Sequence, residues 1–93
     1  MKQQPISISS HAADRFRRDI RPDAYNVKGT LVALWCQSAP ATYEDLEQAH
    51  LQRYDHCTYH TATYHHEGDI VLVMAVEYSN EGTPVMTTVK RKK

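Results

Sequence analysis

The most prominent hydrophobic pattern in the chain is an uninterrupted apolar run over residues 70–76. The run is short, rich in β-branched side chains and free of Gly and Pro, which is typical of a strand that is buried on both faces. Successive side chains of a strand point to opposite faces, so the even-numbered and the odd-numbered residues would each form an apolar surface. We therefore predict a central strand over residues 70–78.

Segments of alternating apolar and polar residues flank this strand in the sequence. Residues 57–66 precede it and are rich in Thr and Tyr, and residues 85–90 follow it. The connecting segments, 67–69 and 79–84, contain Gly, Asp, Asn and Pro, which are the residue types of tight turns. Because short turns join antiparallel neighbours, the pattern predicts a three-stranded β-meander with residues 70–78 in the middle.

The N-terminal part of the chain has a helical pattern after a short extended segment. Residues 6–8 alternate Ile with Ser and predict an edge strand, and Ser9 or Ser10 is suited to cap a following helix over residues 11–20. The apolar residues expected to face the sheet recur at helical spacing: Ala12, Ala13, Phe16 and Ile20. This helix is therefore expected to be amphipathic, with a charged face toward solvent.

Two more helices are expected before the meander. Residues 24–37 have apolar positions at helical spacing; residues 30–36 also fit a strand, and we favour the helix. Thr42 is suited to cap a third helix, with Asp45 at the capping-box position.

These elements form a single α+β domain over residues 1–93, with N-terminal helices packed on an antiparallel β-meander whose central strand is 70–78. Helices on one face of the sheet would leave the second apolar face of that strand uncovered, so we predict a homodimer through this face. Residues 90–93 are all basic and are predicted to form a disordered tail.

The net charge of the chain is zero, but the charges are unevenly distributed. Basic residues gather in residues 1–30 and in the tail, whereas residues 31–89 contain eight acidic residues and one basic residue, Arg53. This division fits a polyanion-binding side on an acidic body, or a solvated helix face with a disordered tail. The sequence has no apolar leader and no long apolar segment, which predicts a cytoplasmic protein without a membrane span, in which Cys36 and Cys57 are free thiols.

One face of the first helix carries the residues with the clearest candidate chemistry. His11, Arg15 and Arg18 are spaced at i, i+4 and i+7 and share the side away from the sheet. Cleavage of RNA without a metal needs a general base or acid near neutral pH and fixed positive charge beside the phosphate. Imidazole supplies the first and guanidinium the second. The alternative is that these are ordinary solvated residues of a helix surface.

The same helix carries a family resemblance. Residues 10–18 read Ser-His-Ala-Ala-Asp-Arg-Phe-Arg-Arg, and residues 87–90 read Thr-Thr-Val-Lys. A His-Ala-x-x-Arg helix after a short strand, followed by a β-meander whose last strand carries Thr, resembles small prokaryotic and phage domains of the barnase–EndoU–colicin–RelE fold group. Many members of that group are metal-independent ribonucleases and toxins. The resemblance covers the order of elements along the whole chain, and the chain departs from it in the long middle, residues 24–53.

The resemblance implies an RNA-directed, toxin-like domain and a metal-independent endoribonuclease. His11 would be the acid or base, Arg15 and Arg18 the phosphate ligands, and Thr88 a polar contact from the last strand. The residues expected to bind nucleic acid are Arg17, Tyr64, Lys90, Arg91 and Lys92. No cofactor is expected, and RNA is the expected partner. The alternative is a non-catalytic phage or mobile-element protein that binds and inhibits a host protein through its acidic middle and its tyrosines.

A group of potential metal ligands lies in and before the strand at 57–66: His50, His56, His60, His65, His66 and Cys57. No CxxC or HExxH motif is present, and alternation would point His56 and Cys57 to opposite faces. We therefore predict no metal site, with zinc-assisted folding as the remaining alternative. Alternation also places Tyr59 on the other face from Tyr54 and Tyr64, so no single aromatic platform is predicted.

Overall fold

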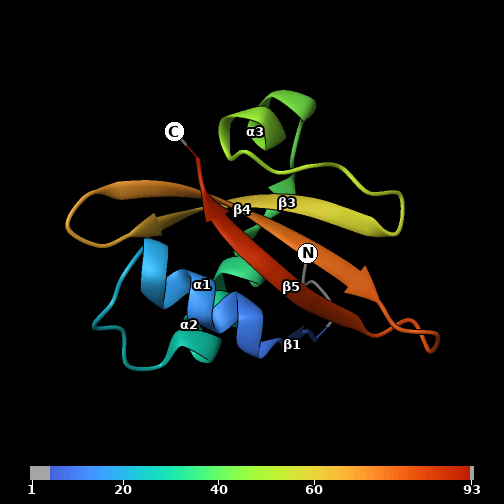
Figure 1. Ribbon diagram of the computed structural model, residues 1–93. Helices are drawn as coiled ribbons and strands as arrows, with labels where there is room; N and C mark the ends of the chain where they lie inside the picture. Colours follow the sequence, from blue (N-terminus) through green and yellow to red (C-terminus); the bar gives the residue numbers. More distant parts are fainter. Residues whose placement is uncertain (1–4, 93) are drawn as a thin grey trace.

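The computed structural model describes residues 5–92 as an α+β fold in which three helices pack on a five-stranded sheet. The elements in chain order are β1 (Ser7–Ile8), α1 (Ser10–Asp19), α2 (Val27–Gln37), β2 (Ala39–Pro40), α3 (Tyr43–Gln48), β3 (Cys57–His65), β4 (Asp69–Tyr78) and β5 (Pro84–Arg91). The strand order across the sheet is β1-β5-β4-β3-β2 (Figure 1). The predicted fold class is confirmed. No helix within residues 5–92 combines the length and the apolarity needed to cross a membrane.

β4 is the central strand, as the apolar run predicts. It pairs antiparallel with β3 on one side and with β5 on the other, which is the predicted meander. Its residues Leu72, Met74 and Val76 are fully buried against α1 and α2, and Val73 is fully buried on the opposite face. Burial of one such side chain contributes about 1.5–3 kcal/mol, so this strand supplies a large part of the stability of the core.

Two-residue strands extend the meander at both edges. β1 pairs parallel with β5, with Ser7 opposite Val85, and β2 pairs antiparallel with β3, with Ala39 opposite Thr61. The edge strand predicted at residues 6–8 is therefore present. Its parallel partner makes the sheet mixed, whereas the meander alone is antiparallel.

α1 and α2 cover one face of the sheet (Figure 1). The side chain of Ser9 accepts a hydrogen bond from the Ala12 N–H at 3.0 Å and so caps α1, because the first backbone N–H groups of a helix have no partner within it. The buried residues of the two helices are Ala12, Ala13 and Phe16 in α1 and Val27, Leu31, Leu34 and Trp35 in α2. Residues 30–36 belong to a helix, the alternative that the spacing favours.

α3 lies on the opposite face of the sheet from α1 and α2 (Figure 1), although all helices are predicted to lie on one face. The predicted capping box is present: Asp45 N–H donates to Thr42 Oγ1 at 3.1 Å, and Thr42 N–H donates to Asp45 Oδ2 at 2.9 Å. Leu46 and Ala49 pack on Val73. Because the chain itself covers the second face at this point, the reason given for a homodimer no longer holds.

The basic C-terminal segment is part of the fold rather than a disordered tail. Lys90 and Arg91 belong to β5, and Lys92 Nζ lies 2.6 Å from Asp45 Oδ1 of α3. Lys93 lies outside the described residues. The run of like charge predicts disorder, but pairing with β4 and one carboxylate partner override it.

Candidate functional site

The basic face of α1 is on the surface. His11, in the first turn, and Arg17 and Arg18 are exposed. Arg15 is half-buried, and its Nε lies 3.5 Å from Asp19 Oδ2, an ion pair at i,i+4 spacing. The helix therefore carries three arginines, and the charge of one of them, Arg15, is partly neutralised by Asp19.

Thr88 lies on the other face of the sheet from α1. In the β4–β5 register Thr88 is opposite Ala75, while the next residue, Val89, is opposite Met74 and belongs to the core beneath α1 and α2. Since neighbouring strand residues point to opposite faces, Thr88 points to the α3 side. The four predicted catalytic residues are thus divided by the sheet, with His11, Arg15 and Arg18 on one side and Thr88 on the other. The order of residues along the chain predicts which helix or strand carries each of them, but not the face of the sheet to which its side chain points.

Tyr64 of β3 packs in the core beneath α1. Its side chain is buried, its ring meets the ring of Phe16 edge-on at 5.3 Å, and its hydroxyl accepts a hydrogen bond from Arg21 Nη1 at 2.9 Å. This hydrogen bond makes the largest contribution to raising the pKa of Arg21 above its usual value. Tyr64 is therefore a core residue, and its contact with nucleic acid stays a prediction.

Two of the three basic residues that are predicted to bind nucleic acid at the end of the chain, Lys90 and Lys92, contact other parts of the protein. Lys90 Nζ donates to the backbone oxygen of His50 at 3.4 Å, and Lys92 is paired with Asp45. Arg91 is exposed, and it lies with Lys92 beside a shallow hollow at the start of β4. Among Lys90, Arg91 and Lys92, Arg91 is the exposed residue that makes neither the contact with His50 nor the one with Asp45.

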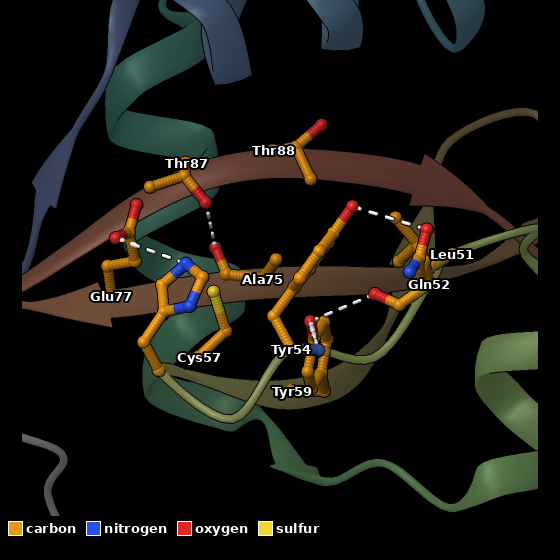
Figure 2. A pocket seen from close by; sticks show the side chains of 10 residues that line it. Leu51, Gln52, Tyr54, Cys57, Tyr59, Ala75, Glu77, Thr87 and Thr88 are labelled. Atoms are coloured by element: carbon orange, nitrogen blue, oxygen red, sulfur yellow. Dashed lines mark hydrogen bonds and ion pairs between the residues drawn. The ribbon is translucent and has the colours of Figure 1, made fainter.

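A pocket of about 340 Å³ lies on the α3 side of the sheet (Figure 2). Its walls come from β3, β4, β5 and the loop before β3: Leu51, Gln52, Tyr54, His56, Cys57, Tyr59, Ala75, Glu77, Thr87 and Thr88. Thr87 and Thr88 both line it because the β4–β5 register shifts between Ala75 and Val76, which interrupts the regular alternation. Thr88 is thus the only predicted catalytic residue in this pocket.

The loop that closes the pocket is held by Tyr59 of β3. The Tyr59 hydroxyl accepts a hydrogen bond from the Tyr54 N–H at 2.9 Å and donates one to the Gln52 oxygen at 3.0 Å (Figure 2). A β-turn then begins at Tyr54, whose oxygen accepts from the Cys57 N–H at 3.2 Å. Tyr54 and Tyr59 therefore line one pocket, contrary to the prediction, because Tyr54 precedes the strand and does not follow its alternation.

His56, Cys57 and Glu77 form a cluster at one end of this pocket. One potential ligand atom of each lies within 4.8 Å of those of the other two. His56 Nε2 and Glu77 Oε1 are 3.5 Å apart, and both side chains are about half exposed. Cys57 and Glu77 are directly opposite each other in the β3–β4 register.

This cluster is not predicted from the sequence, because strand alternation is applied to His56, one residue before the predicted strand at 57–66. β3 begins at Cys57, so His56 belongs to the preceding turn and lies on the same side as Cys57. The pairing follows from the turn: counting back equally from the observed turn at 66–68 pairs Cys57 with Glu77, whereas the predicted turn at 67–69 would pair Cys57 with Ser79. The prediction that His56 and Cys57 point apart is wrong.

The cluster is suited to acid–base chemistry or to metal coordination rather than to thiolate attack. Burial, and secondly the charge of Glu77, raise the pKa of the Cys57 thiol above its usual range. Nucleophilic cysteines have lowered pKa values. His60, a residue of the same strand, points into the α2 side against Trp35, where burial lowers its pKa.

Comparisons with known proteins add no relative: no family model matches the chain, and no curated protein or solved structure matches it significantly.

Proposed function

We propose that this chain is an RNA-directed, toxin-like endoribonuclease that works without a metal, and that its active site is the pocket on the α3 side. The observation that carries the proposal is the His56–Glu77 pair, with Nε2 and Oε1 3.5 Å apart, in a pocket that also contains Thr88 of the last strand. An imidazole can act as a general base, and a neighbouring carboxylate can orient its ring for that role. The His11 face of α1 is then a phosphate-binding surface rather than the catalytic centre.

The proposed reaction is attack of the ribose 2′ oxygen on the adjacent phosphorus. His56 accepts the proton of the 2′-hydroxyl, and Glu77 stabilises the resulting imidazolium. The bond from phosphorus to the 5′ oxygen breaks, and the leaving oxygen takes a proton from Tyr54. Tyr54 is assigned this role because its hydroxyl donates to the exposed side chain of Gln52, whereas the Tyr59 hydroxyl is held by backbone groups. The products are a 2′,3′-cyclic phosphate and a 5′-hydroxyl.

Residues beside the pocket supply what RNA binding requires. Lys90 lies two residues after Thr88 in β5 and so points to the same face, where its ammonium group can leave the His50 oxygen for a phosphate. Tyr54 is about half exposed and offers a ring face for an unpaired base.

The test is cleavage of mixed-sequence RNA, single-stranded and hairpin, in buffer with EDTA. His56→Ala should reduce the rate by about a hundredfold or more, the usual contribution of a positioned acid or base. His65→Ala is the matched control, because His65 also pairs with a carboxylate on β3–β4, at 2.6 Å from Asp69, but does not line the pocket. Intact RNA with the wild-type protein would overturn the proposal. So would a rate that falls with His11→Ala and not with His56→Ala.

A second candidate function, binding to a host protein, is favoured by one observation. Tyr43 at the start of α3 is 70% exposed, and the Arg53 guanidinium lies 4.6 Å from the centre of its ring. Exposed Tyr and Arg side chains are the residues that dominate protein interfaces. This function predicts a stoichiometric protein complex that Tyr43→Ser abolishes, while recovery of nucleic acid alone would count against it.

A further inference from the structure

The His56–Cys57–Glu77 cluster combines three kinds of metal-binding atom on a rigid base. Cys57 and Glu77 are cross-strand partners in the hydrogen-bonded ladder of β3 and β4, so their side chains start from neighbouring points on the same face (Figure 2). His56 is set by the turn that begins at Tyr54, and that turn is tied to the sheet through the Tyr59 hydroxyl. The three donors are therefore brought together by backbone structure rather than by chance contact of long side chains.

The distances fit a tetrahedral ion. Ligand atoms at 2.0–2.3 Å from a tetrahedral zinc ion are separated from one another by roughly 3.3–3.8 Å. His56 Nε2 and Glu77 Oε1 are already 3.5 Å apart. The Cys57 sulfur lies within 4.8 Å of the other donors, so a shift of about 1 Å by side-chain rotation completes the set.

We propose that His56, Cys57 and Glu77 bind a zinc-class divalent transition-metal ion, with one coordination position left to water. A nitrogen, a thiolate sulfur and one carboxylate select zinc or cobalt over magnesium and calcium, which prefer oxygen ligands. Three protein ligands on a partly exposed surface form an exchangeable site rather than a closed structural one. The site does not depend on the proposed ribonuclease activity.

Binding would regulate that activity if the activity is present. A bound ion occupies the His56 nitrogen and the Glu77 carboxylate, the two groups that the proposed cleavage uses. Zinc should therefore inhibit cleavage, and EDTA should restore it. The metal would act as a switch on a metal-independent reaction.

The direct test is titration of the untagged protein with Co²⁺ at pH 7.5 in the absence of RNA. Tetrahedral cobalt bound to a thiolate gives a charge-transfer absorption band in the near ultraviolet and visible bands that report its geometry. We expect one equivalent to bind, zinc to displace it and magnesium to leave it unchanged. Cys57→Ser should abolish the charge-transfer band. Cys36→Ser removes the other free thiol, which is exposed, and should leave the band unchanged.

The other two ligands have matched controls of their own. His56→Asn and Glu77→Gln should each weaken cobalt binding by at least about tenfold, since loss of an outer-shell partner alone commonly costs 10–100-fold. His65→Asn and Glu81→Gln should bind as the wild type does. The wild-type protein without a charge-transfer band would overturn the proposal, as would a band that depends on Cys36. Because no RNA is present, an inactive ribonuclease leaves this result unaffected.

Discussion

The contact between Lys92 and Asp45 ties the end of the chain to α3, and its contribution to stability can be predicted. Lys92 Nζ lies 2.6 Å from Asp45 Oδ1, and the two side chains are only 26% and 14% exposed. An exposed ion pair contributes about 0–1 kcal/mol, and a hydrogen bond to a charged group about 1.5–3 kcal/mol. We expect a coupling energy of about 1 kcal/mol for this partly buried pair.

The perturbation is a double-mutant cycle with Lys92→Met and Asp45→Asn. Methionine keeps the length of the lysine stem, and asparagine keeps an oxygen for the Thr42 N–H, so the capping box survives while the charge is removed. The free energy of unfolding is measured by urea denaturation for the wild type, both single variants and the double variant. The cycle isolates the pair from the effects of each substitution alone.

The coupling energy should depend on pH, and the pKa of Asp45 determines the direction of that dependence. The hydrogen bond from Lys92, followed by that from the Thr42 backbone, lowers the pKa of Asp45 from its usual 3.8. A lowered pKa in the folded state stabilises the fold above the unfolded-state pKa, and this stabilisation is lost as the pH falls through the folded-state pKa. The coupling should therefore be full at about pH 7 and should decrease as the pH is lowered toward about 2. A coupling near zero at pH 7, or one that is equal at both pH values, would contradict the reasoning.

Three further substitutions test the fold. Ser9→Ala should destabilise the protein by about 1 kcal/mol in urea denaturation, because α1 loses its cap. The control Ser10→Ala should change the free energy of unfolding little, and equal effects of the two substitutions would refute the cap assignment. Leu72→Ala should cost about 2–5 kcal/mol, and a smaller loss in thermal unfolding would mean that β4 is not the packed centre. Tyr64→Phe should lower stability slightly by removing the hydrogen bond from Arg21, and its affinity for RNA in a filter-binding assay should equal that of the wild type; weaker binding would identify Tyr64 as a nucleic-acid ligand.

The fold could be predicted from the sequence where one local pattern decides the outcome. The apolar run of residues 70–76, the turn residues beside it and the helical spacing of Ala12 and Phe16 all point to the observed meander and α1. The side of the sheet on which α3 lies is not decided locally. It depends on how Leu46 meets Val73 across the fold, a contact between residues far apart in the sequence.

The candidate site could be predicted only in part, for a related reason. Thr88 was found as a polar residue of the last strand, but its face depends on the register with β4. The start of the strand at Cys57 is predicted correctly, but extending its alternation back to His56 fails, because His56 lies in the turn before the strand. One residue decides the face of a side chain, since the strand period is two. Chemistry at the ends of strands is therefore poorly predicted by alternation alone.

If the proposed function is correct, RNA binds at the pocket on the α3 side of the sheet. The most direct measurement is an NMR titration of the ¹⁵N-labelled protein with a mixed-sequence 2′-O-methyl RNA, which binds but cannot be cleaved. We expect the largest amide shifts at His56, Cys57, Glu77 and Thr88, with smaller shifts on α1. Shifts confined to the surroundings of His11 and Arg15, or no shifts at all, would contradict it.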